Sequence, residues 1–213
     1  MKWIDLSMPV YSGMPVYPED PAVRIDPVLI HDEHQLQVSR LVMGSHSGTH
    51  LDAPRHYYAN GATVDQLDLD QLITSALVVS CPWQAGQLLD LTGLDLSLYQ
   101  QGDALLLSTG WDQLVGTIQY YAGMPLFAAG STDFLLSLGI RLFGLDLPSV
   151  CEFSERLQPA AMHLDLLGAG IVLVECLVGL QPLVGRRVDF QAVPLKLAGC
   201  DGSPVRACAR LIA

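Results

Sequence analysis

Apolar residues in the later two thirds of the chain gather into short continuous runs rather than into an alternating pattern. Runs of this kind, bounded by glycine or proline, are typical of strands that are buried on both faces. They are "ALVVSC" at residues 76–81, "ALLLST" at 104–109, "IRLFGLDL" at 140–147 and "GIVLVECLV" at 170–178. The pattern therefore predicts four strands at the centre of the fold.

Two segments between these runs predict helices. In "STDFLLSLG", Ser131 is suited to be the N-cap of a helix and Gly139 to end it. In "PAAMHLDLLGAG", Pro159 suits the first turn of a helix and Gly168 its end. The alternation of strands and helices predicts an α/β fold.

The two ends of the chain differ from its centre. The first quarter is rich in proline and glycine, which predicts short strands and loops. Residues 188–212, "VDFQAVPLKLAGCDGSPVRACARLI", predict a hairpin of two strands around a turn at Gly199–Gly202. The whole of residues 1–213 is expected to form a single α/β domain with a mixed β-sheet core and flanking helices.

Composition limits the partners that this domain is expected to have. The chain of 213 residues is 50% hydrophobic and 15% charged, with a formal net charge of −11. Nucleic acids and anionic membranes are polyanions, so neither is expected as a partner. High apolar content with few charges predicts that another subunit covers part of the surface, as in a homodimer or a higher homo-oligomer.

The cysteines and the N-terminus predict a cytoplasmic location. The five cysteines are an odd number and form no C-x-x-C pair, which fits reduced thiols better than a disulfide framework. The first residues, "MKWIDLSMPV", lack the apolar region of a signal peptide. The most apolar stretch, residues 169–185, contains Glu175 and Pro182 and is not expected to span a membrane.

Candidate chemistry is concentrated in "GSHSGTHLDAPRHYY", which contains His46, His50, Asp52 and His56. Their offsets are all even, so an extended chain would turn the four side chains to one face. Gly48 and the proline two residues before His56 disfavour a helix. The segment is therefore expected to be extended or looped, with its polar groups converging.

Two imidazoles and a carboxylate that converge form a set of metal ligands suited to Zn²⁺, Mn²⁺ or Fe²⁺. The plainer alternative is a polar loop whose histidines are satisfied by hydrogen bonds. His56 is either a further ligand or a free base beside the metal, because an imidazole titrates near neutrality.

Polar residues in the later apolar segments are candidates to complete this site. Glu175 lies inside "IVLVECLV", where a glutamate must be paired, protonated or bound to metal. His163 lies on the preceding predicted helix, and a turn at Gly168–Gly170 would bring the two together. The alternatives are a solvent-facing His163 and a salt-bridged Glu175. Asp146, at a strand end, is either part of a site or the cap of a turn.

The pattern H-x-G-T-H-x-D-x-P-x-H in "HSGTHLDAPRH" resembles the signature of the metal-dependent cyclase-like hydrolases, a family that includes bacterial kynurenine formamidase and isatin hydrolase. The resemblance extends over nearly the whole chain. It includes the segments "DLSMPVYSGMPVYPEDP", "LLLSTGW", "FGLDLPSV" and "PLKLAGCDGSPVRACA", and the twelve-residue step from His163 to Glu175.

The resemblance implies a swivelling β/β/α fold and a site with two divalent cations, zinc or manganese. By position, it implies that His46, His50 and Asp52 bind one cation. It implies that Asp52 also binds a second cation, which is held by His163 and Glu175.

The resemblance also implies a reaction. A metal-activated hydroxide would cleave the carbon–nitrogen bond of a small aryl formamide or cyclic amide, such as N-formylkynurenine, with His56 as the acid–base. The alternatives are isatin-type ring opening, a metal-dependent dehydratase or cyclase reaction, and metal binding without catalysis. The chain departs from the family pattern at Glu19 and Cys151, two positions that are expected to affect the substrate pocket.

Overall fold

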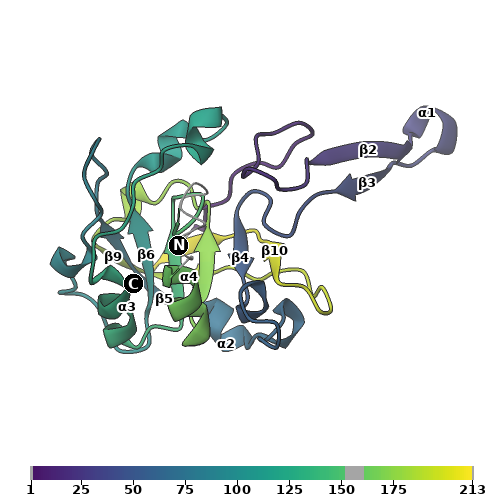
Figure 1. The fold of residues 1–213 in the computed structure, drawn as a ribbon. Coiled ribbons are helices and arrows are strands. Elements are labelled where there is room, and N and C mark those ends of the chain that lie inside the picture. The colour runs from purple at the N-terminus through teal and green to yellow at the C-terminus, as the bar shows by residue number, and fades with distance from the viewer. Residues whose placement is uncertain (1, 152–160, 213) are drawn as a thin grey trace.

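The computed structural model describes residues 2–151 and 161–212. It contains a mixed nine-stranded sheet in the order β1-β11-β9-β5-β6-β7-β8-β4-β10 and a separate two-stranded ribbon of β2 and β3 (Figure 1). The strands are β1 (Ile4–Asp5), β2 (Arg24–Leu29), β3 (Val38–Val42), β4 (His50–Asp52), β5 (Ile73–Ser80), β6 (Ala104–Ser108), β7 (Leu142–Leu145), β8 (Val172–Glu175), β9 (Arg186–Gln191), β10 (Gly202–Pro204) and β11 (Cys208–Leu211). The α-helices are α1 (His31–His34), α2 (Leu69–Leu72), α3 (Ser131–Leu138) and α4 (Ala161–Gly168).

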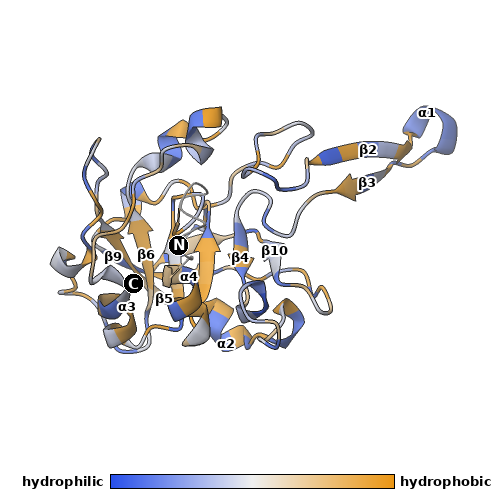
Figure 2. Ribbon diagram, viewed as in Figure 1, coloured by the Kyte–Doolittle hydropathy of each residue, from blue (hydrophilic) through white to orange (hydrophobic). Residues whose placement is uncertain are grey.

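The four apolar runs form the parallel centre of the large sheet, β5, β6, β7 and β8, which confirms the sequence-based prediction. Figure 2 shows these strands in the colours of hydrophobic residues. Successive side chains of β6 enter opposite cores: Leu105 and Leu107 pack into one, and Leu106 into the other. Both faces of the sheet are therefore covered, which is why these strands are apolar throughout.

The large sheet is strongly curled. β10 is the edge strand at one end of the strand order and β11 is next to the edge strand at the other end, yet Pro204 and Cys208 are only four residues apart in the chain. Four residues span at most about 14 Å, so the two edges of the sheet must approach each other. The result is the expected α/β architecture with a mixed sheet. None of the described helices is long and apolar enough to cross a membrane.

Helix α3 ends at Gly139, as predicted, with a left-handed φ of 66°. The prediction of Ser131 as its N-cap is wrong, because Gly130 occupies that position with a φ of 87° and Ser131 is the first helical residue. The Ser131 hydroxyl is buried and donates to the carbonyl of Leu89 in a neighbouring loop. A tertiary contact thus takes the hydroxyl that the local pattern assigned to the cap.

Helix α4 ends at Gly168, as predicted, and a tight turn with Gly170 at a φ of 77° leads directly into β8. The chain thereby folds back, with α4 packed beside β8, so that side chains from the two elements can meet. Pro159, predicted in the first turn of this helix, lies outside the described residues.

The two strands predicted in residues 188–212 do form an antiparallel pair, because β9 pairs with β11 and a bridge between Pro194 and Val205 continues the same register. The predicted turn at Gly199–Gly202 is part of a longer loop, in which β10 pairs with β4 at the other edge of the sheet (Figure 1). Gly202 lies opposite Asp52 in that pairing. β9 already has β5 and β11 as neighbours, so no edge of β9 is open to the turn segment. The excursion places residues 199–204 beside the histidine-rich segment.

The ribbon of β2 and β3 projects away from the body of the molecule, with α1 at its tip (Figure 1). Every residue of β3 is exposed. The large apolar side chains exposed on this arm are Val28, Ile30, Leu36, Val38, Leu41 and Val42.

Candidate metal centre

The short strand β4 carries His50 and Asp52 on one face, with Leu51 on the other face in the hydrophobic core. β4 pairs with β8 so that His50 lies directly opposite Glu175. The imidazole Nε2 of His50 lies 3.4 Å from Oδ1 of Asp52 and 3.5 Å from Oε2 of Glu175. Cross-strand pairing therefore produces the first part of the site.

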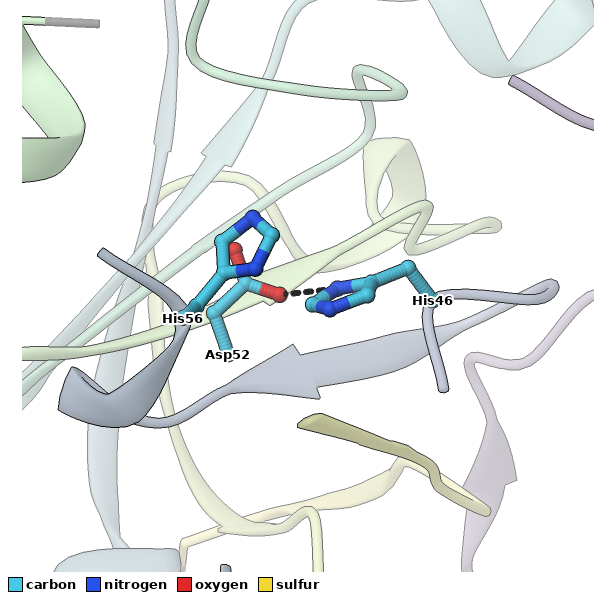
Figure 3. Close-up of side chains that lie close together, drawn as sticks. All are labelled: His46, Asp52 and His56. Atoms are coloured by element: carbon cyan, nitrogen blue, oxygen red, sulfur yellow. Dashed lines mark hydrogen bonds and ion pairs between the residues drawn. The ribbon is translucent and has the colours of Figure 1, made fainter. Parts of the chain in front are cut away.

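His46 and His56 reach the same place by other means. Only residues 50–52 of the predicted extended segment form a strand. His46 lies in the turn before it, and His56 ends a 3-10 helix over Pro54–His56. The chain turns at Gly48, whose φ is 67°. The four side chains converge as expected, but loops rather than strand alternation bring the outer two inward. Figure 3 shows His46 and His56 on either side of Asp52.

The distances at the outer end of the site are short. Nδ1 of His46 lies 2.7 Å from Oδ1 of Asp52. The dashed line in Figure 3 marks this contact. The rings of His46 and His56 have centroids 4.1 Å apart and are tilted by 38°. The side chain of His56 is 29% exposed, so this end of the site is open to solvent.

The structure places His163 and Glu175 in the same cluster. His163 is buried, and its Nε2 lies 3.6 Å from Oδ2 of Asp52 and 3.5 Å from Oε1 of Glu175. The ring of Tyr57 stacks on His163 with a centroid distance of 4.6 Å and an angle of 16°. The Val150 amide donates to Oε1 of Glu175. All six residues singled out in the sequence therefore meet, while their individual roles stay predictions.

The separations between the polar atoms of the cluster suit ligands around a cation better than hydrogen bonds among the same atoms. Asp52 is completely buried, and its Oδ2 has no hydrogen-bond partner among the described residues. Separations of 3.4–3.6 Å are too long for good hydrogen bonds. They match the edge of a tetrahedron around a metal with bonds of about 2.1 Å, which is about 3.4 Å. The ligand atoms of His50, Asp52 and Glu175 lie within 4.8 Å of one another, as do those of His46, Asp52 and His56.

When no cation is bound, protonated histidines balance the negative charge of the buried carboxylates. Burial opposes the charge of the His50 and His163 imidazoles, but the adjacent carboxylate of Asp52 outweighs burial and raises the pKa of both well above its usual value. Burial likewise opposes the charge of His46, yet the attraction of Asp52 raises its pKa to about 9. A divalent cation would take the place of these protons, since ligands bind metal in their deprotonated form.

His56 differs from the other histidines. Burial lowers its pKa, and the attraction of Asp52 does not compensate for burial and for the repulsion from His46 and His163. Its imidazole is therefore neutral at pH 7 and able to accept a proton, which suits an acid–base better than a buried ligand.

Asp201 belongs to the site and was missed by the sequence analysis. Its Oδ2 lies 2.9 Å from Nε2 of His46 and 3.4 Å from Nδ1 of His56. In the sequence, Asp201 and Gly202 read as the residues of a hairpin turn. The only local signal was a carboxylate beside a glycine, because the pairing of β10 with β4 that brings it to the histidines is not encoded locally.

Asp146 is a structural residue. Its buried carboxylate accepts hydrogen bonds from the amide and hydroxyl of Thr109 and from the amide of Gly110. It thereby holds the chain as it leaves β6. Cys151, one of the two departures from the family pattern, lies closer to the cluster, with its Sγ 3.4 Å from Nδ1 of His163.

Comparison with known proteins identifies the family of this chain. The Cyclase family, described as "Putative cyclase", matches residues 4–150. The kynurenine formamidase of Geobacillus thermodenitrificans is 33% identical over 98% of this chain and 97% of its own length.

Solved structures show the same fold. An isatin hydrolase bound to the product analogue thioisatinate superposes with a TM-score of 0.86 at 23% identity, covering 98% of this chain and 91% of the other. A potential metal-dependent hydrolase with cyclase activity gives a TM-score of 0.77 at 27% identity, covering 98% and 96%. Since motif, fold and full-length similarity agree, the chain belongs to the cyclase family.

Proposed function

We propose that this protein is a metal-dependent hydrolase that cleaves the carbon–nitrogen bond of a small aryl formamide or cyclic aryl amide, with N-formylkynurenine as the first substrate to test. The observation that carries the proposal is the buried Asp52 carboxylate, one oxygen of which has no hydrogen-bond partner among the described residues, inside a ring of histidines and Glu175. Full-length relatives named kynurenine formamidase support the substrate class.

In this proposal His46, His50 and Asp52 hold one divalent cation, and Asp52, His163 and Glu175 hold a second, either zinc or manganese. The two carboxylate oxygens of Asp52 face different partners, Oδ1 toward His46 and His50 and Oδ2 toward His163, which supports a bridging role. When bound, such cations lower the pKa of a coordinated water toward neutrality and polarise a carbonyl oxygen.

The protein's own residues then orient the reaction and move a proton. Nδ1 of His56 lies toward Asp201, which leaves Nε2 free to carry a proton to the leaving nitrogen. Because His56 is at the exposed end of the cluster, a small substrate can reach it from solvent. The balanced result is one water consumed, with a carboxylate and an amine released; for a formyl anilide the carboxylate is formate.

The test is metal analysis of the purified protein together with hydrolysis assays on N-formylkynurenine and isatin, after chelation and reloading with Zn²⁺ or Mn²⁺. We expect His163→Ala to lose metal and activity. Asp165→Ala, an exposed carboxylate on the same helix, is the matched control and keeps both. Metal-loaded protein that is inert toward all amides would leave only metal binding, and conversion without a released carboxylate would point to a dehydratase or cyclase.

The exposed arm supports the further proposal that the protein is a homodimer or a higher homo-oligomer. A two-stranded ribbon is marginally stable alone in water, and the arm exposes apolar side chains such as Leu41, which is 61% exposed. A second copy of the chain packed against the arm would bury them. We expect Leu41→Lys to reduce the mass measured by light scattering, and Ile118→Lys, at an apolar side chain that is 77% exposed outside the arm, to leave it unchanged. A monomeric wild-type protein would refute the proposal.

A cytoplasmic location is part of the same proposal. All five cysteines have free thiols, as expected in a reducing compartment. Fractionation of cells that express the protein would test it, and recovery in the periplasmic or secreted fraction would contradict it.

A further inference from the structure

Asp201 lies against the site, and the proposed reaction uses it only as the group that Nδ1 of His56 faces. Its Oδ2 lies 2.9 Å from Nε2 of His46, and its Oδ1 accepts a hydrogen bond of 3.1 Å from the hydroxyl of Ser45. One oxygen is thus held by the serine while the other faces the imidazole. The carboxylate has a defined orientation although its side chain is 40% exposed.

The two nitrogens of His46 face different groups. Nδ1 points into the cluster, 2.7 Å from Oδ1 of Asp52, and Nε2 points out of it toward Asp201. A histidine that binds metal through one nitrogen commonly donates the N–H of the other to a carboxylate, which fixes the tautomer and the plane of the ring. Asp201 has the position of that carboxylate.

The fold places Asp201 as firmly as it places the ligands. The carbonyl of Asp201 accepts a hydrogen bond of 2.8 Å from the amide of Ala53, next to Asp52, and Gly202 pairs with Asp52 across β10 and β4. A Cβ at position 202 would lie 2.7 Å from Cε1 of His46. The approach of this backbone to the imidazole therefore requires glycine, and the close contact is built into the strand pairing.

We propose that Asp201 is a positioning residue for the metal centre, which holds the Nε2–H of His46 so that Nδ1 faces the cation. Ser45 orients Asp201 in turn, which gives an ordered chain from Ser45 through Asp201 and His46 to the ligand cluster. The proposal rests on the proposed function, in which His46 is a metal ligand. It adds a residue outside the H-x-G-T-H-x-D-x-P-x-H motif to the groups on which metal affinity depends.

The test measures Co²⁺ affinity by the visible absorption of the bound ion during titration of chelator-treated protein. We expect Asp201→Ala to bind Co²⁺ about 10–100-fold more weakly than wild type, as is usual when the carboxylate partner of a histidine ligand is removed. Asp201→Asn keeps an acceptor for Nε2–H without the charge, so it is expected to recover most of the affinity and the wild-type absorption bands.

Two further variants separate this role from others. Asp65 accepts a hydrogen bond from the amide of Gly199 and anchors the same loop without touching His46. Asp65→Ala is therefore expected to keep wild-type affinity. An equal loss in Asp65→Ala and Asp201→Ala would show that only the loop position matters and would overturn the proposal.

The remaining outcomes are also decisive. If Asp201→Asn binds as weakly as Asp201→Ala, the effect is one of charge at a distance, and the positioning role is wrong. If Asp201→Ala binds Co²⁺ like wild type while His46→Ala does not, the proposal fails and the metal centre stands. If His46→Ala itself binds like wild type, the assignment of His46 as a ligand in the proposed function is what fails.

Discussion

Replacing Gly202 by alanine tests how closely β10 must approach the site. The φ of Gly202 is not left-handed, so alanine has no backbone penalty there, and the whole effect is steric. The new Cβ would lie 2.7 Å from Cε1 of His46 and 2.8 Å from the carbonyl oxygen of Leu51. Ordinary contacts begin at 3.4 Å, so both atoms are about 0.7 Å too close.

The size of the effect follows from which neighbours can move. The His46 ring can tilt, but only away from Asp52 and Asp201, whereas the Leu51 carbonyl belongs to the ladder between β4 and its neighbours. Overpacking of this kind costs about 1–3 kcal/mol. For a chain of this length, each kcal/mol lowers the melting temperature by about 2–4 °C.

The assay is denaturant unfolding of the metal-free protein, followed by circular dichroism, with a Co²⁺ titration of the same samples. Gly93→Ala is the matched control, because a Cβ there meets nothing within 4 Å and its φ is also not left-handed. That control is expected to gain about 0.4–1 kcal/mol, since alanine restricts the unfolded chain. If Gly202→Ala is as stable as wild type and binds Co²⁺ equally well, the close approach of β10 to His46 is not as the structure shows.

Three further predictions concern the metal, the acid–base and the strand end. Zn²⁺ at 100 times its Kd is expected to stabilise chelator-treated protein by about 2.7 kcal/mol in calorimetry. Asp52→Ala is expected to lose both this stabilisation by Zn²⁺ and the hydrolytic activity. Stabilisation by Zn²⁺ that persists in this variant would contradict the proposed site. His56→Ala is expected to keep metal while kcat falls about 10²–10⁴-fold, and normal turnover would remove its acid–base role. Asp146→Asn places an amide N–H₂ group opposite the N–H donors of Thr109 and Gly110, so the free energy of unfolding is expected to fall by about 1–3 kcal/mol. The Co²⁺ affinity is expected to stay unchanged. An unchanged midpoint of denaturant unfolding would refute this prediction.

Local sequence was sufficient for the elements that depend on local physics. The four central strands were predictable because a strand buried on both faces needs an unbroken apolar run. Gly139 and Gly168 were predictable as helix ends because glycine readily ends a helix. The residues of the metal centre were predictable as a group, because histidines and carboxylates crowd into one segment and because Glu175 stands alone in an apolar strand.

The mode of assembly was less predictable. The prediction for His46 and His56 was an extended or looped segment with converging side chains, and in the structure a turn at Gly48 and a 3-10 helix bring these residues inward. Ser131 was assigned to a helix cap by its local pattern, but the carbonyl of Leu89, 42 residues away, takes its hydroxyl. In the case of Ser131, a distant contact outweighed a weak local preference.

The edge of the sheet that each strand joins could not be predicted from any local pattern in the sequence. Periodicity indicates that residues form a strand and which face is buried, but not which of several open edges the strand will join. β9 and β11 formed the predicted antiparallel pair, but β10 in the loop between them joined β4, because the curled sheet brought that edge within reach of a short connection. That choice set Asp201 beside His46, so composition and spacing supplied the proposed ligands, while tertiary pairing supplied the carboxylate that is proposed to orient one of them.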